Sequence, residues 1–181
     1  MQDKRHAWWA KIVYRLKALT VRIGLLALAV AFELASVLSR RVRQELSYWP
    51  DGLTFAMGVL PNGPTISIKK IPGNRVQYLG RGLHSPDVSI LFKNLDCAMM
   101  VFLGSIGTPQ AAAERRFVVH GNIADSTRVA RTLAIVQAFL FPEFVVRATY
   151  RRPPKMGLGD LSIKMAIYLA LLPGLAIRAF R

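Results

Sequence analysis

The order of the elements predicted between Pro86 and Pro142 constrains the fold of this chain more than any other feature. Residues 87–93 alternate as in a strand, with Val88, Ile90 and Phe92 on one side. The predicted order is a strand over 87–93, a helix over 95–104, a short helix over 108–114, a strand over 116–120 and a long helix between 122 and 142. Strands that alternate with helices in this way predict a layer of helices on a sheet.

Residues suited to helix starts and ends support these bounds. Asn94 and Asn122 are placed as N-caps, and Thr108 is placed as the cap of the short helix, with Pro109 at its first position. Gly104 and Pro142 end the first and the last of the three helices.

Three further strands are predicted upstream, over 54–60, 65–71 and 75–79. The run Pro61-Asn-Gly-Pro64 predicts a hairpin turn, because Asn-Gly tolerates positive φ. The sequence therefore predicts an α+β fold: a mainly antiparallel sheet of about five strands, covered on one face by helices, with apolar basic helices at both termini. We expect a helical membrane-associating segment over 1–48, a central domain over 49–150, and a basic linker with an apolar helix over 151–181.

The central stretch resembles the sterol-carrier-protein-type-two family, the small lipid-binding domain also called the SCP sterol-binding domain. The resemblance lies in the order and spacing of the strand over 87–92, the helix ending in Phe102-Leu103-Gly104, the segment 108–114 and the run 117–122 before the long helix. It implies a lipid tail held in a tunnel between sheet and helices. Some bacterial relatives of this domain act as accessory factors in ubiquinone synthesis, so an isoprenoid, quinone-like or acyl lipid is the implied cargo.

Large flexible apolar side chains could line such a tunnel, and methionine repacks around variable ligands. Taken alone, a Met and Phe stripe is more often a closed core, and the resemblance favours a cavity. The predicted lipid-binding residues are Met57, Phe92, Met99, Phe102, Leu103, Val129, Leu133, Val136, Phe139 and Leu140.

The N-terminus interleaves basic and aromatic residues. Trp8 and Trp9 fall beside Lys11 and Arg15 on a helical wheel, a pattern typical of a helix that lies in the headgroup region of a membrane. The alternative is a solvated helix packed on its own domain. Arg40 and Arg41 are further candidates for membrane contact.

Two apolar runs are too short or too interrupted to be strong membrane spans. Residues 23–38 contain Glu33 and favour a re-entrant or buried core helix over a single-pass one. The run 165–180 is broken by Pro173-Gly174 and predicts an interfacial helix or a lid over an apolar cavity.

The net charge of +15 lies mostly on the flanks. Residues 1–50 hold nine Lys and Arg against three acids, and residues 144–181 hold seven against one, while the middle holds nine against six. Basic apolar flanks around a nearly balanced centre favour an anionic membrane surface over nucleic acid, and they place the protein at the cytoplasmic face of a membrane.

The sequence lacks recognisable catalytic chemistry. The single Cys97 excludes an intramolecular disulfide, and the three histidines have no spacing that predicts a metal site or relay. We therefore expect a non-enzymatic protein without cofactor or metal, whose partners are a lipid, an anionic membrane and a membrane enzyme or complex. A membrane-associated assembly factor that scaffolds a protein complex is the alternative.

Overall fold

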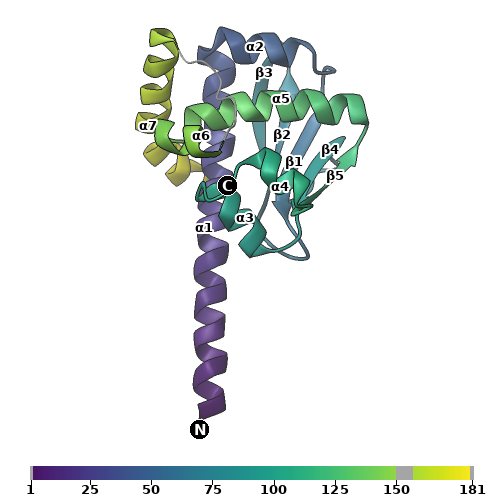
Figure 1. The fold of residues 1–181 in the computed structure, drawn as a ribbon. Helices are drawn as coiled ribbons and strands as arrows, with labels where there is room; N and C mark the ends of the chain where they lie inside the picture. Colours follow the sequence, from purple (N-terminus) through teal and green to yellow (C-terminus); the bar gives the residue numbers. More distant parts are fainter. Residues whose placement is uncertain (1, 150–156, 180–181) are drawn as a thin grey trace.

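A five-stranded sheet forms the centre of the molecule (Figure 1). The computed structural model describes residues 2–149 and 157–179. The strands are β1 (Thr54–Val59), β2 (Thr65–Ile71), β3 (Arg75–Arg81), β4 (Val88–Phe92) and β5 (Phe117–Gly121). Their order across the sheet is β3-β2-β1-β4-β5, so that β3 and β5 are the two edges.

The sheet is mixed, although mainly antiparallel. β1 pairs parallel to β4, with Met57 opposite Ile90, and the other three pairs are antiparallel. The parallel pair arises because the chain returns from the β3 edge to the far side of β1. The predicted α+β class and the predominance of antiparallel pairs are confirmed. The structure adds one parallel pair, β1 with β4, that the sequence did not predict.

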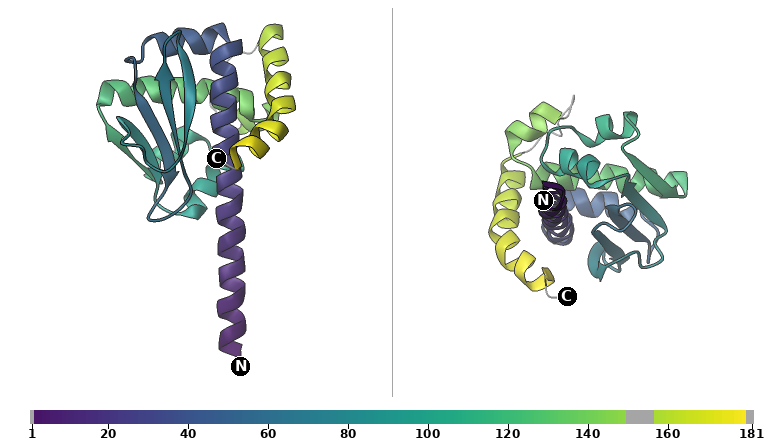
Figure 2. Two further views of the ribbon diagram at one scale, coloured as in Figure 1. Left: turned by 180° about the vertical axis from the view of Figure 1, so that it is seen from behind. Right: turned by 90° about the horizontal axis from the view of Figure 1, so that it is seen from below.

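Helices cover one face of this sheet (Figures 1 and 2). They are α1 (Gln2–Leu38), α2 (Arg40–Ser47), α3 (Leu95–Phe102), α4 (Thr108–Ala113), α5 (Ile123–Leu140), α6 (Glu143–Thr149) and α7 (Leu158–Ala179). α1 packs on β2 and β3, α5 packs on β4 and β5, and α7 lies against the outer side of α1.

The second half of α1 is part of the core. Leu25, Leu28 and Phe32 are buried among the side chains of the sheet and of α5. The segment Lys11–Leu38 is long and apolar enough to cross a membrane by length and composition, yet 56% of its most apolar window is buried inside the protein. That burial agrees with the reading of residues 23–38 as a core helix.

The other face of the sheet carries mostly small or polar side chains, with the buried Leu91 of β4 as an apolar exception. Ala56, Ser67 and Ser89 alternate with the core residues along β1, β2 and β4. One apolar and one polar face is the pattern expected for a sheet with helices on a single side.

Two local predictions were wrong. Gly107, not Thr108, is the N-cap of α4, and the Thr108 hydroxyl instead donates to Gln137 Oε1 at 2.9 Å. α7 continues through Pro173 instead of breaking there, because proline removes one backbone hydrogen bond and bends a helix without having to end it. The predicted basic linker over 151–155 lies outside the described residues.

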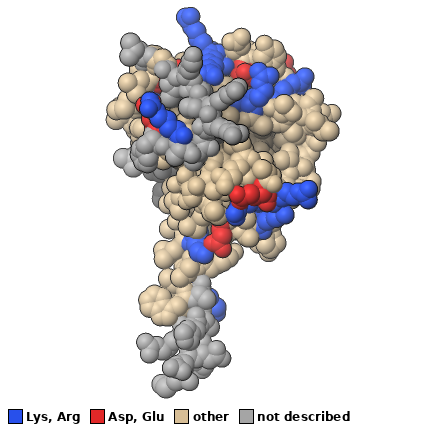
Figure 3. Space-filling view, viewed as in Figure 1, with Lys and Arg blue, Asp and Glu red and all other residues tan. Residues whose placement is uncertain are grey.

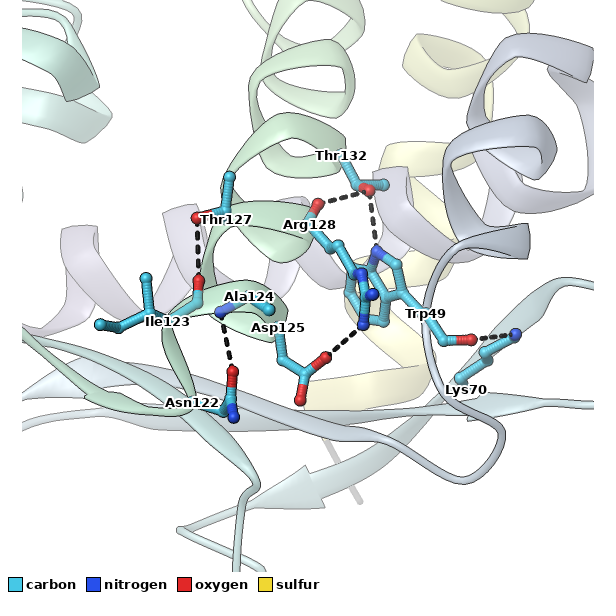
Figure 4. Close-up of polar contacts among 9 residues, drawn as sticks. All are labelled: Trp49, Lys70, Asn122, Ile123, Ala124, Asp125, Thr127, Arg128 and Thr132. Atoms are coloured by element: carbon cyan, nitrogen blue, oxygen red, sulfur yellow. Dashed lines mark hydrogen bonds and ion pairs between the residues drawn. The ribbon is translucent and has the colours of Figure 1, made fainter.

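A polar network fixes α5 over the sheet (Figure 4). Asn122 caps the helix by accepting from the main-chain N–H of Ala124 at 2.8 Å. Trp49 Nε1 donates to Thr132 Oγ1 at 3.0 Å, and the carbonyl of Trp49 accepts from the buried Lys70 Nζ at 2.6 Å. Lys70 also pairs with Asp51, so the chain after α2 ties α5 to β2.

Lys164 fixes α7 to the same layer. Its buried ammonium donates to the Ala138 carbonyl of α5 at 3.2 Å. Burial lowers the pKa of Lys164 below its usual range, and the carboxylate of Glu143 acts in the opposite direction.

Candidate functional site

An open groove of about 540 Å³ lies between α4, α5 and the β4–β5 edge of the sheet. We call it the α4–α5 groove. Its lining consists of Ile90, Thr108, Pro109, Ala112, Phe117, Val119, Gly121, Ile123, Ser126, Thr127, Ala130, Leu133, Ala134 and Gln137. None of these side chains is charged. On the face shown in Figure 3, charged side chains gather along the upper edge and at the lower right, and the surface between them is mostly uncharged.

Small side chains on α5 keep this groove open. Ser126, Ala130 and Ala134 follow one another at four-residue intervals and so lie on one face of the helix, toward β5. Val119 lies on the helix-covered side of β5, opposite Ile90 in β4, yet 45% of it is exposed. The sheet therefore offers apolar surface at this edge that α5 does not cover.

The polar groups of the groove are few. The Ser126 hydroxyl is buried and has no hydrogen-bond partner among the described residues. Thr108 and Gln137 bond to each other at the opposite end of the lining. An apolar groove with a few convergent polar atoms is the usual form of a small-molecule site.

Most of the predicted lipid-binding residues lie in the closed core next to this groove. Leu133 is the one that lines the groove itself. The fully buried members are Met57, Phe92, Val129, Leu133, Val136 and Phe139. Met99, Phe102 and Leu140 are partly buried against the same core, and Leu103 is exposed. Contact of these residues with a lipid stays a prediction.

Phe92 shows how the core next to the groove is closed. Its ring centroid lies 5.9 Å from that of Phe102 and 5.6 Å from that of Phe117. Aromatic rings at these distances pack directly against each other. Phe92 and Phe102, two of the residues expected to line a tunnel, thus pack against each other between α3 and the sheet.

The groove residues that sequence reasoning missed are the small ones on α5. Ser126, Ala130 and Ala134 are neither large nor strongly apolar, so a search for bulky lining residues passes over them. Their regular four-residue spacing, which places small side chains along one face of the helix, was the signal in the sequence that could have indicated the groove.

The predicted membrane-contact residues separate into two groups. Trp8, Trp9, Lys11 and Arg15 lie on the N-terminal part of α1, which projects away from the rest of the molecule (Figure 1). Arg40 and Arg41 begin α2 at the other end of α1. At 1.5 Å per helical residue, roughly 48 Å separates Trp8 from Arg40.

Exposed apolar side chains mark the projecting part of α1. Trp8, Trp9, Leu16 and Leu19 are each more than half exposed. Lys17, on the same segment, pairs with Asp96 of α3 at 2.6 Å and so fixes the helix where it leaves the core.

Comparison with known proteins finds matches among solved structures only; no protein-family model and no curated protein matches the chain. The sterol carrier protein domain 2 of Helicoverpa armigera is 16% identical, with a TM-score of 0.42, over 60% of this chain and 84% of that one. The UbiJ-SCP2 ubiquinone synthesis protein is 15% identical, with a TM-score of 0.42, over 64% of this chain and 95% of that one. Sterol carrier protein 2 of Yarrowia lipolytica is 14% identical, with a TM-score of 0.39, over 66% of this chain and 88% of that one. All three carry the name of the family that the central stretch of the sequence resembles.

Proposed function

We propose that this protein binds the apolar tail of an isoprenoid, quinone-like or acyl lipid in the α4–α5 groove. It would carry or present that lipid at the cytoplasmic face of a membrane. The observation that carries the proposal is an uncharged groove of about 540 Å³ that leaves apolar sheet surface open beside α5. Burial of a tail stabilises the complex by about 0.8 kcal/mol per CH₂, before the entropic cost of binding.

The lining favours binding without catalysis. General acid–base catalysis needs a titratable side chain within reach of the substrate, and the described lining holds no Asp, Glu, His, Lys or Cys. The Ser126 hydroxyl can donate one hydrogen bond to an oxygen atom of the ligand.

The projecting part of α1 supports the membrane half of the proposal. Tryptophans at the water–lipid interface combine an apolar body with a polar edge, and neighbouring lysines and arginines face anionic headgroups. Trp8, Trp9, Lys11 and Arg15 present both features on a helix that extends beyond the core.

Filling the groove tests the tail site. Ala130→Trp places an indole in the groove, because Ala130 lines it and is exposed. We expect the lipid that copurifies in mild detergent, quantified by mass spectrometry of the organic extract, to fall at least about tenfold. Ala124→Trp is the matched control, since Ala124 is exposed on the same helix but outside the lining. An equal lipid load in all three folded proteins would place the lipid elsewhere.

Charge introduced at the tip of α1 tests the membrane contact. Trp8→Glu/Trp9→Glu is expected to reduce cosedimentation with vesicles of anionic lipid about tenfold or more, because two aromatic anchors are lost and two repulsive charges are gained. Tyr48→Glu, at another exposed aromatic residue beyond α2, should leave binding unchanged. Equal binding of the double variant and the Tyr48 control would contradict this contact.

A further inference from the structure

The two edges of the sheet differ in how their main-chain groups are satisfied. At the β3 edge, the Tyr78 N–H donates to Glu33 Oε1 of α1 at 2.6 Å. The Val76 N–H donates to Ser36 Oγ of the same helix at 3.4 Å. At the other edge, every residue of β5 after Phe117 is exposed, and Figure 1 shows β5 at the border of the sheet. α1 therefore covers one edge, while the β5 edge is open.

The register of β5 shows which of its main-chain groups face the open edge. The Lys93 N–H donates to the Arg116 carbonyl at 3.0 Å, so these two residues form a hydrogen-bonded pair that continues the antiparallel β4–β5 ladder. Hydrogen-bonded pairs alternate with non-hydrogen-bonded pairs along such a ladder. Phe117, Val119 and Gly121 therefore direct their N–H and C=O groups away from β4. None of these three N–H groups donates to a side chain in the part of the chain that the structure describes.

β5 also lacks the features that keep an edge strand from pairing with another chain. Those features are charged side chains, proline, a bulge or a covering element. β5 contains no Lys, Arg, Asp, Glu or Pro, and it pairs with β4 without a register shift. Val118, Val119 and Ile123 are exposed apolar residues on or beside it. A protein strand would satisfy the main-chain groups as well as cover these side chains, whereas lipid would leave the main-chain groups without partners.

Charge and symmetry favour a second copy of this chain as the occupant of the β5 edge. Residues 112–126 hold Glu114 and Asp125 against Arg115 and Arg116, so the segment around β5 is neutral in a chain of net charge +15. Two copies with this net charge repel each other, and the repulsion is weakest where the surfaces that meet are neutral. Identical antiparallel strands also match by symmetry, because a two-fold axis places the donors of one copy opposite the acceptors of the other.

We propose that β5 pairs antiparallel with β5 of a second copy and joins the two sheets into one. In the register centred on the two-fold axis, Val119 faces Val119 of the second copy and Phe117 faces its Gly121, which allows about six main-chain hydrogen bonds. The axis is perpendicular to the sheet, so the helices of both copies lie on the same face. Because Val119 lines the α4–α5 groove, the two grooves lie side by side across the axis. The pairing does not require a bound lipid.

Analytical ultracentrifugation of the full chain in excess nonionic detergent tests the pairing. A five-residue edge is smaller than a standard interface, so we expect a weak dimer that dissociates on dilution. Val119→Pro removes an outward N–H without removing a hydrogen bond to β4, and edge strands tolerate proline. We expect it to weaken dimerisation at least about tenfold. Trp8→Glu/Trp9→Glu is the control for association through α1 and should dimerise like the unaltered protein. Circular dichroism confirms that each variant is folded.

Cysteine cross-linking tests the register. In a Cys97→Ala background, Val119→Cys places two thiols opposite each other on the axis, with Cα atoms about 5.5 Å apart, which a disulfide can bridge. Ile123→Cys is the matched control, because the two Ile123 residues lie at opposite ends of the paired strands. Ile123 is 85% exposed and Val119 is 45% exposed, so random collision would favour the control. We expect Val119→Cys to form the disulfide dimer at least about tenfold faster under mild oxidation.

Three results would overturn the proposal. The first is a chain that is still monomeric at about 1 mM, which would leave the β5 edge to a strand of another protein. The second is a dimer of equal strength in Val119→Pro, which would place the contact on another surface. The third is disulfide formation in Ile123→Cys that is as fast as in Val119→Cys, which would mean collision without a fixed register. The copurified-lipid assay of Ala130→Trp measures the groove separately from all three.

Discussion

Phe32→Ala is expected to lower the free energy of unfolding by about 3–5 kcal/mol. Phe32 is 1% exposed and is among the largest fully buried side chains of the described residues. Its ring centroid lies 6.1 Å from that of Trp49 and 6.4 Å from that of Phe55, so it joins α1 to β1 and to the chain after α2. Truncation leaves a cavity at that junction, which rigid neighbours fill only in part.

Urea denaturation followed by far-ultraviolet circular dichroism measures this loss. Ile23→Ala is the control on the same helix: Ile23 is 47% exposed, and its truncation should cost much less. Similar losses for the two variants would mean that α1 is not anchored through Phe32. A large difference would show that the second half of α1 is held in the core through Phe32.

Gly121→Ala is expected to destabilise the protein by about 2–6 kcal/mol, the sum of backbone strain and overpacking. Gly121 ends β5 with φ at +125°, a conformation that favours glycine. A Cβ atom there would lie much closer to the Asp87 carbonyl oxygen than van der Waals contact allows, and 3.1 Å from Val88 Cα.

These neighbours cannot move easily. Asp87 N–H donates to the Thr54 carbonyl at 2.9 Å, and Asp87 Oδ2 accepts from the Thr54 N–H at 2.8 Å, so β1 holds the residue from two sides. Gly121 also lines the α4–α5 groove, so the substitution acts on the edge of the proposed site.

Gly73→Ala is the control that separates backbone strain from the steric clash at Gly121, and urea denaturation again measures the stability. Gly73 has φ at +81°, and a Cβ atom there would meet nothing within 4 Å. The free energy of unfolding of this variant should fall only by the cost of placing alanine in the left-handed conformation, about 1–2 kcal/mol. If Gly121→Ala cost no more than Gly73→Ala, the close approach of β5 to Asp87 would not be a constraint.

The sequence by itself determined the elements and their class. Alternation over 54–60, 65–71 and 87–93 marks strands because side chains alternate across a sheet, and Asn94 and Asn122 mark helix starts because their side chains accept orphan N–H groups. These signals are local, and the structure reproduces them. The burial of residues 23–38 was also favoured from sequence, because Glu33 makes a lipid environment costly; its Oε1 accepts from Tyr78 N–H at 2.6 Å.

Only the tertiary structure decided where space remains. A bulky side chain such as Phe92 suits a closed core or a tunnel equally well in sequence, and here Phe102 and Phe117 pack against it. The groove instead opens where Ser126, Ala130 and Ala134 leave Val119 uncovered. A cavity forms where elements that are distant in sequence pack together without filling the space between them. Local periodicity therefore cannot predict its position.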